Sequence, residues 1–137
     1  MSKLHHPKPN QSQLIPTPII EADNRLIRNH PIFCLRYLHK NYNVESCSQA
    51  DRASLIRQMA NLSQLSWDEI KLSGRHGMGS EKIKRKSIKA SIPQEITPDV
   101  EDFLALRYSG KKAFIGFRNN YIFHIIYIDS DYSVYKH

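Results

Sequence analysis

The chain has 137 residues, which is the size of one domain and enough to bury a core without disulfides or a metal ion. Its hydrophobic content of 40% is ordinary for a globular protein, and no apolar run approaches the ~20 residues that span a membrane. The net charge of +7 favours a polyanionic partner, either a nucleic acid or an acidic protein.

The two cysteines, Cys34 and Cys47, have neither CxxC nor zinc-type spacing, so the sequence predicts free thiols, no metal and no cofactor. The first residues lack the apolar segment of a signal peptide, and we therefore expect a cytoplasmic protein. Residues 1–18 hold four prolines among polar residues and predict a flexible lead-in. Residues 19–137 then form a single domain.

The apolar run 32–38 follows Pro31 and fits either a short helix or a strand. The clearest helix extends from about Gln49 to Leu65, with Ser48 as its N-cap. Its apolar stripe consists of Leu55, Ile56, Met59, Leu62 and Leu65. A capping box that starts at Ser66 predicts a second, short helix, which carries Trp67 inward.

Three glycines within 74–79 predict a loop, and a strongly basic segment surrounds it. Residues 71–90 contain seven lysines and arginines and a single acid, Glu81. Farther along, Thr97-Pro98-Asp99 predicts the start of a helix of one or two turns.

The C-terminal part alternates like a sheet, with candidate strands at 103–108, 112–118, 121–128 and 132–136. Two-residue turns are expected at Ser109-Gly110, Asn119-Asn120 and Asp129-Ser130. The predicted fold class is therefore α+β, with N-terminal helices packed on one face of a C-terminal antiparallel sheet of three to four strands.

Strand parity sorts the side chains of this sheet onto two faces. The aliphatic face should receive the helices, and it holds Leu104, Leu106, Ala113, Ile115, Phe117, Ile122, His124, Ile126 and Ile128. The other face mixes aromatic and cationic side chains, among them Phe103, Arg107, Lys112, Phe114, Arg118, Tyr121, Phe123 and Tyr127. An open face of this kind suits single-stranded RNA, whereas the alternative is that another element covers these aromatics.

The residues predicted to contact RNA are Lys82, Lys84, Arg85, Lys86, Lys89, Lys112, Tyr121 and Tyr127. Arg107 and Arg118 on one face are candidates for clamping a scissile phosphate and its developing charge. His76 and Glu81 beside the basic segment are candidate acid–base groups, and the alternative for both is an ordinary surface position.

Four segments of the C-terminal third carry a resemblance: Leu106-Arg107-Tyr108, Ile115-Gly116-Phe117-Arg118, the run 123–128 and Tyr135-Lys136-His137. Together they resemble the closing strands of RelE-type toxin ribonucleases. The resemblance implies metal-free cleavage of mRNA, usually on the ribosome, by attack of the ribose 2′-hydroxyl on the neighbouring phosphate. It also implies an antitoxin partner, and it places Arg107, Arg118, Tyr135 and His137 where such enzymes have site residues.

Two other classes of function fit the same charge pattern. One is a non-catalytic nucleic-acid-binding module, which would use the same basic and aromatic residues without a reaction. The other is a protein-interaction subunit whose basic segment meets an acidic partner.

Overall fold

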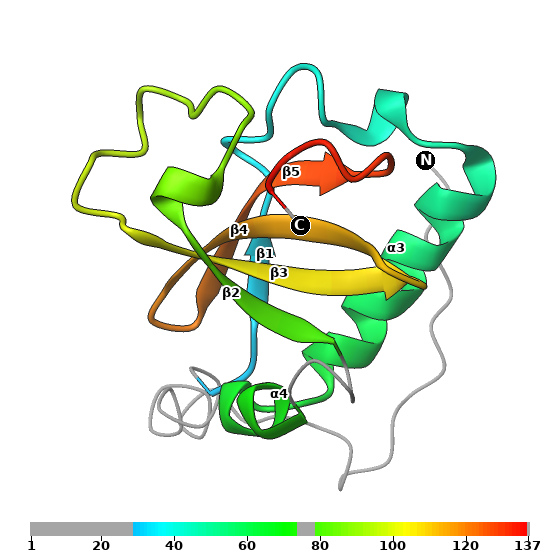
Figure 1. Ribbon diagram of the computed structural model, residues 1–137. Helices are drawn as coiled ribbons and strands as arrows, with labels where there is room; N and C mark the ends of the chain where they lie inside the picture. Colours follow the sequence, from blue (N-terminus) through cyan, green and yellow to red (C-terminus); the bar gives the residue numbers. More distant parts are fainter. Residues whose placement is uncertain (1–28, 74–78, 137) are drawn as a thin grey trace, which may run out of the picture.

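The computed structural model describes residues 29–73 and 79–136, which form a five-stranded sheet with two α-helices (Figure 1). The strands are β1 (Ile32–Cys34), β2 (Ser80–Lys84), β3 (Asp102–Ser109), β4 (Lys112–Asn119) and β5 (Ile122–Asp129). Their order in the sheet is β1-β5-β4-β3-β2; β1 is parallel to β5, and the other neighbours are antiparallel.

The α+β class with helices against the sheet is confirmed, and two details of the prediction are corrected. The helices are not N-terminal, because β1 precedes them in the chain and pairs with β5. The sheet has five strands with a parallel edge, instead of three to four antiparallel strands. The ambiguous run 32–38 thus begins as a strand, which is only three residues long.

The helices α3 (Gln49–Ser63) and α4 (Trp67–Ser73) begin where the sequence predicts. The Ser48 hydroxyl accepts a hydrogen bond from the Asp51 backbone N–H at 3.1 Å. At α4 the box is reciprocal, because Glu69 N–H donates to Ser66 Oγ and Ser66 N–H donates to the Glu69 carboxylate, both at 3.1 Å. These side chains satisfy backbone donors that have no partner within the helix. None of the helices in the described part is long and apolar enough to cross a membrane.

The helices cover one face of the sheet, here called the helix-side face, which includes Leu106, Phe114 and Ile125. Leu55 and Leu62 of α3 are buried against it, as are Trp67 and Ile70 of α4. The predicted stripe is only partly correct, because Ile56 is 63% exposed.

The predicted assignment of side chains to faces is correct for Leu104 and Leu106 of β3, which lie with the helix-side cluster, but it is wrong for β4 and for Ile126 of β5. Leu106 of β3 pairs with Phe114 instead of Ala113, which moves the side chains of β4 to the opposite face from the predicted one. The β4–β5 loop is Asn120-Tyr121, so Asn119 pairs with Ile122. Ile115 pairs with Tyr127 while Gly116 pairs with Ile125, which leaves Ile126 as an extra residue in β5. A shift of one residue moves a strand's side chains to the opposite face. The helices therefore do not pack on the expected face of Ile115 and Ile126, which belong to a second cluster on the other face.

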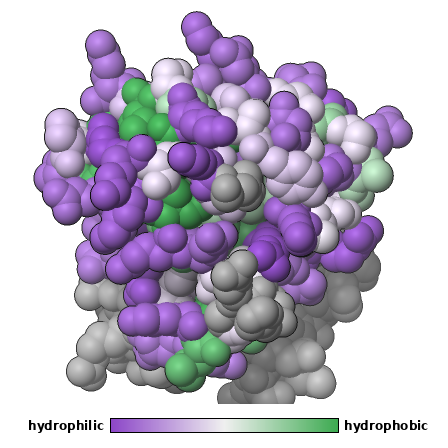
Figure 2. Space-filling model, viewed as in Figure 1, coloured by the Kyte–Doolittle hydropathy of each residue, from purple (hydrophilic) through white to green (hydrophobic). Residues whose placement is uncertain are grey.

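That second face, the loop-side face, is closed by segment 85–100 and by the C-terminal residues (Figure 1). It buries Phe103 and Tyr127 beneath Ile96, Val134 and other apolar side chains. The expected open aromatic face is thus covered, which was the alternative, and the surface above it is largely hydrophilic (Figure 2).

The covering layer contains no regular strand or α-helix. The predicted strand 132–136 is reduced to one bridge between Tyr135 and Ile88. The predicted helix at Thr97-Pro98-Asp99 is only a turn. Buried Asp129 holds the C-terminal segment in place, because its carboxylate accepts hydrogen bonds from the backbone N–H groups of Ser133 and Val134.

Candidate functional site

The register separates the two arginines that were expected to act together. Arg107 of β3 pairs with Ala113, a residue of the loop-side cluster. Arg118 of β4 pairs with Phe123, a residue of the helix-side cluster. The two side chains therefore leave opposite faces of the sheet, and the expectation that they clamp one phosphate is corrected.

Three of the predicted site residues do come together on the loop-side face, and we name them the Glu81–Arg107–Tyr135 cluster. Glu81 of β2 pairs with Ala105, two residues before Arg107 on β3, so both side chains are on the same face. The hydroxyl of Tyr135 donates to the Glu81 carboxylate at 3.3 Å. Arg107 is close enough for its charge to act on the Tyr135 phenol.

Gly79 gives the Arg107 side chain its path along the sheet. It has a positive φ of 76°, and its carbonyl accepts the Arg107 backbone N–H at 3.3 Å. A Cβ at this position would lie 2.6 Å from Cδ of Arg107, which is far inside van der Waals contact. Glycine is thus required at position 79 for two reasons: the backbone is left-handed there, and the Arg107 side chain passes directly over it.

The electrostatics of the cluster assign different roles to its members. Burial, together with the neighbouring Glu81 carboxylate, raises the pKa of Tyr135 to about 12. Tyr135 therefore keeps its proton at neutral pH and donates a hydrogen bond to the Glu81 carboxylate. Glu81 and Arg107 are both half-buried, so a carboxylate base and a permanent cation are partly accessible beside one another.

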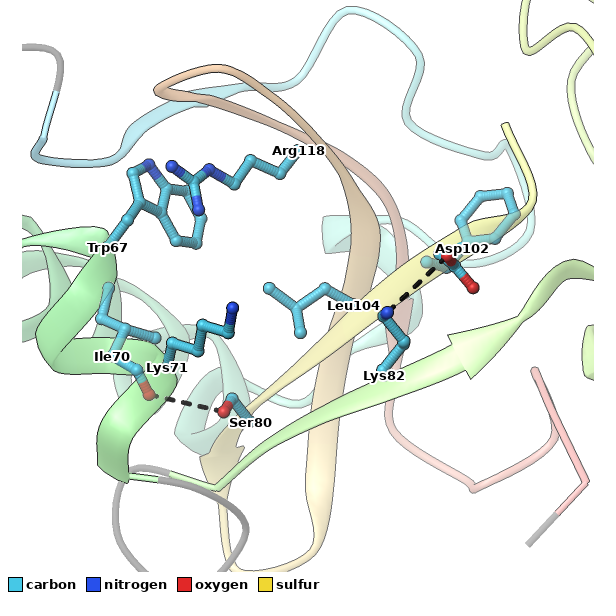
Figure 3. A pocket seen from close by; sticks show the side chains of 9 residues that line it. Trp67, Ile70, Lys71, Ser80, Lys82, Asp102, Leu104 and Arg118 are labelled. Carbon is cyan, nitrogen blue, oxygen red and sulfur yellow. Dashed lines mark hydrogen bonds and ion pairs between the residues drawn. The ribbon is translucent and has the colours of Figure 1, made fainter. Parts of the chain in front are cut away.

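A cavity of about 420 Å³ lies on the helix-side face, between α4 and strands β2–β4 (Figure 3). We name it the Trp67–Arg118 pocket. Apolar side chains form part of its wall, and three cations and one carboxylate line it as well. The lining residues are Trp67, Ile70, Lys71, Ser80, Lys82, Asp102, Phe103, Leu104 and Arg118.

Arg118 is held in place at the pocket by two contacts. Its guanidinium carbon lies 4.6 Å from the centre of the Trp67 ring (Figure 3). Its Nε donates to the Asn120 carbonyl. The indole is itself fixed, because Trp67 Nε1 donates to the Tyr121 carbonyl at 3.0 Å. Burial lowers the pKa of Arg118, and the Asp68 carboxylate opposes the shift. The guanidinium still remains charged at neutral pH.

The other predicted RNA-contacting cations differ in how they are engaged. Lys84 pairs with Asp102 at 2.8 Å, and Lys82 lies 3.8 Å from the same carboxylate. Arg85 is structural, because its guanidinium donates to the carbonyls of Ile96, Thr97 and Val100. Lys86 and Lys89 are exposed.

Two of the remaining candidates, Lys112 and Tyr127, serve the fold in this structure. Lys112 binds the Asp51 carboxylate of α3 at 2.9 Å. Tyr127 is fully buried and donates its hydroxyl to the Ser91 carbonyl at 2.9 Å, so its ring is not presented to a ligand. Tyr121 is half-buried beside the helix-side core. His76 and His137 lie outside the described residues.

Sequence reasoning missed Trp67, Lys71 and Leu104 as residues of one site. Trp67 and Lys71 lie four positions apart, which places them on one side of a helix, and this spacing was a usable signal. No local pattern joins them to Leu104, because only the fold brings α4 over β3.

Among residues 29–73 and 79–136, no group of three or more His, Cys, Asp or Glu side chains is arranged to hold a metal ion. No protein-family model matches the chain, and neither a curated protein nor a solved structure shows significant similarity to it.

Proposed function

We propose that the protein is a toxin-like endoribonuclease that cleaves RNA without a metal ion, at the Glu81–Arg107–Tyr135 cluster. The observation that carries the proposal is the meeting of a carboxylate, a guanidinium and a phenol from three separate segments of the chain. The positive net charge of +7 supports a polyanionic substrate.

In this mechanism Glu81 takes the proton of a ribose 2′-hydroxyl, whose oxygen then attacks the adjacent phosphorus. Arg107 stabilises the negative charge that develops on the phosphate oxygens. The bond from phosphorus to the 5′-oxygen breaks, and that oxygen takes a proton from water. Glu81 then gives its proton to the hydroxide left behind, which restores the carboxylate and the water. The products are a 2′,3′-cyclic phosphate and a 5′-hydroxyl, while Tyr135 holds Glu81 in position through its hydrogen bond.

The same proposal includes a cellular role. The protein acts as a toxin, an acidic antitoxin binds it, and it cleaves RNA on the ribosome. Its support is the sequence resemblance of the C-terminal strands to RelE-type toxins. Expression of the chain should arrest growth, and the Arg107→Ala variant should relieve the arrest.

The deciding experiment is an RNA cleavage assay in EDTA, with and without ribosomes, on wild type, Arg107→Ala, Glu81→Gln and Arg57→Ala. Loss of one charge-stabilising donor typically lowers the rate about 10²–10³-fold, and we expect this for Arg107→Ala. Arg57 is exposed on α3 and has no role in the cluster, so its variant is the matched control. Cleavage that requires a divalent metal, or an Arg107→Ala rate equal to wild type, would reject the mechanism.

A non-catalytic nucleic-acid-binding module remains the second candidate. It is favoured by the Trp67–Arg118 pocket, which is cationic but lies on the other face of the sheet from the cluster. RNA binding by the wild type without cleavage under any condition would support it.

A further inference from the structure

The Trp67–Arg118 pocket combines features that suit a flat, anionic ligand with an apolar part. Its lining carries Lys71, Lys82 and Arg118 against one carboxylate, Asp102. That carboxylate is engaged chiefly from the rim, where Lys84 binds it at 2.8 Å, while Lys82 lies 3.8 Å from it. The pocket is therefore cationic, and its volume of about 420 Å³ lies within the usual range for small-ligand sites.

The guanidinium of Arg118 is the feature that selects the shape of the ligand. One side of this planar group is covered by the Trp67 ring, and the residue as a whole is exposed. Its Nε bond to the Asn120 carbonyl limits rotation of the group. Nucleobases stack readily on arginine planes, and a pre-ordered guanidinium loses little entropy when a base covers its other side.

The rest of the lining matches the other parts of a nucleotide. Leu104 presents an apolar side chain in the middle of the pocket, and Lys71 extends toward the cavity from α4 (Figure 3). Lys82 is opposite Leu104 on the neighbouring strand. The lysines can bind phosphate as point charges.

We propose that the Trp67–Arg118 pocket holds one unpaired nucleotide of single-stranded RNA, with the base on Arg118 and the flanking phosphates at Lys71 and Lys82. The proposal rests on the proposed function for the identity of the strand, and it assigns the pocket to recognition instead of chemistry. An acidic protein segment would use the cations but not the planar stack.

The test measures binding of a labelled single-stranded 2′-fluoro RNA by fluorescence anisotropy, because that probe cannot be cleaved by 2′-hydroxyl attack. Loss of one stacked base costs about 5- to 150-fold in affinity, and we expect this loss for Arg118→Ala. Arg118→Lys keeps the charge and should remain weak, whereas Arg57→Ala should bind like wild type. A probe without bases should bind wild type as weakly as the intact probe binds Arg118→Ala.

The fluorescence of Trp67 provides a second readout, because Trp67 is the only tryptophan in the chain. Bound RNA should change its fluorescence in the wild type, and the base-free probe should not. If Arg118→Ala does not fold, Lys71→Ala replaces it, with an expected fall of ~0.7 in the log–log salt slope.

Several outcomes would overturn the pocket proposal: equal affinity of Arg118→Ala and wild type, full recovery in Arg118→Lys, or equal binding of the base-free probe. Free AMP that changes Trp67 fluorescence without any binding of the RNA probe would also overturn it, in favour of a small-molecule site. Normal probe binding without cleavage of unmodified RNA would reject the proposed function alone.

Discussion

Arg85 and Arg118 show two different uses of one side chain. The fork of Arg85 donates to three backbone carbonyls and so fixes the segment around Ile96, a residue of the loop-side core. Arg118 instead lies on an indole and keeps part of its surface open. Both arginines contribute to the positive charge visible in the sequence, but only Arg118 is exposed, so that a ligand can reach its guanidinium. Composition alone does not distinguish them, because the carbonyl partners of Arg85 are 11–15 positions away.

At the residue scale, Gly79→Ala should lower the cleavage rate by displacing Arg107, since the new Cβ would lie 2.6 Å from Cδ of that side chain. A loss approaching that of Arg107→Ala is expected, about 10²-fold, measured in the RNA cleavage assay. Gly110→Ala is the matched control, because Gly110 also has a positive φ of 58° but nothing within 4 Å of its Cβ position. Equal rates in the two variants would show that the contact between residue 79 and Arg107 does not affect cleavage.

The helices and the central strands follow from signals within each segment. Ser48 and Ser66 mark the helix starts, and alternating residues mark β3, β4 and β5. The pairing between strands does not follow, because two irregularities, one in β3–β4 and one in β4–β5, shift the register. For this reason the sequence could supply Glu81, Arg107 and Tyr135 as candidates but wrongly joined Arg107 to Arg118.

The packing of α3 can be tested with two aliphatic residues that the sequence treated alike. Leu62→Ala should lower the free energy of unfolding by about 2–5 kcal/mol, because Leu62 is fully buried. Ile56→Ala should change it by less than about 0.5 kcal/mol, because Ile56 is 63% exposed. Urea denaturation measures both values. A larger effect for Ile56→Ala would contradict the orientation of the helix.

His39 lies between the sheet and the segment that covers it, and it makes the free energy of unfolding depend on pH. Its Nδ1 accepts the Asn41 backbone N–H at 3.0 Å, and its Nε2 lies 2.7 Å from Ser91 Oγ. This pairing fits a neutral ring that is protonated at Nε2, and burial, with Lys40 adding to the effect, lowers the pKa of His39 from 6.5. As the pH falls, the unfolded chain therefore binds a proton before the folded chain does.

The free energy of unfolding should consequently decrease below about pH 6.5 and level off below the folded-state pKa of His39. His124 acts in the same direction, since burial also lowers its pKa. His39→Gln should thus remove only part of the dependence, as measured by urea denaturation between pH 5 and pH 8. A variant curve parallel to that of the wild type would show that His39 does not titrate in this way.

At the scale of the whole molecule, the charge of the basic segment is used partly for folding. Lys84 and Arg85 are engaged within the fold, whereas Lys86 and Lys89 are exposed. Replacing all the cations of this segment would therefore confuse loss of binding with loss of structure. Fewer cations of this segment are therefore exposed and unengaged than its sequence indicates.

The double variant Lys86→Ala/Lys89→Ala should lower the log–log salt slope of RNA affinity by up to ~1.4 for a single strand, if both lysines contact phosphates. The thermal midpoint should stay near that of the wild type, because neither side chain is buried. Anisotropy titrations at several salt concentrations provide the slope. An unchanged slope would place the phosphate contacts elsewhere on the surface.

The parallel pairing of β1 with β5 has a consequence for the order in which the protein can fold. Ile32 bonds to the segment around Ile122, so the first described strand needs the last one as its partner. During synthesis β1 leaves the ribosome long before β5 exists, whereas β3, β4 and β5 meet through short hairpins. Closing a long loop costs more entropy than closing a hairpin. Addition of β1 to the sheet is therefore the late step, and β1 has no partner strand until β5 has been synthesised.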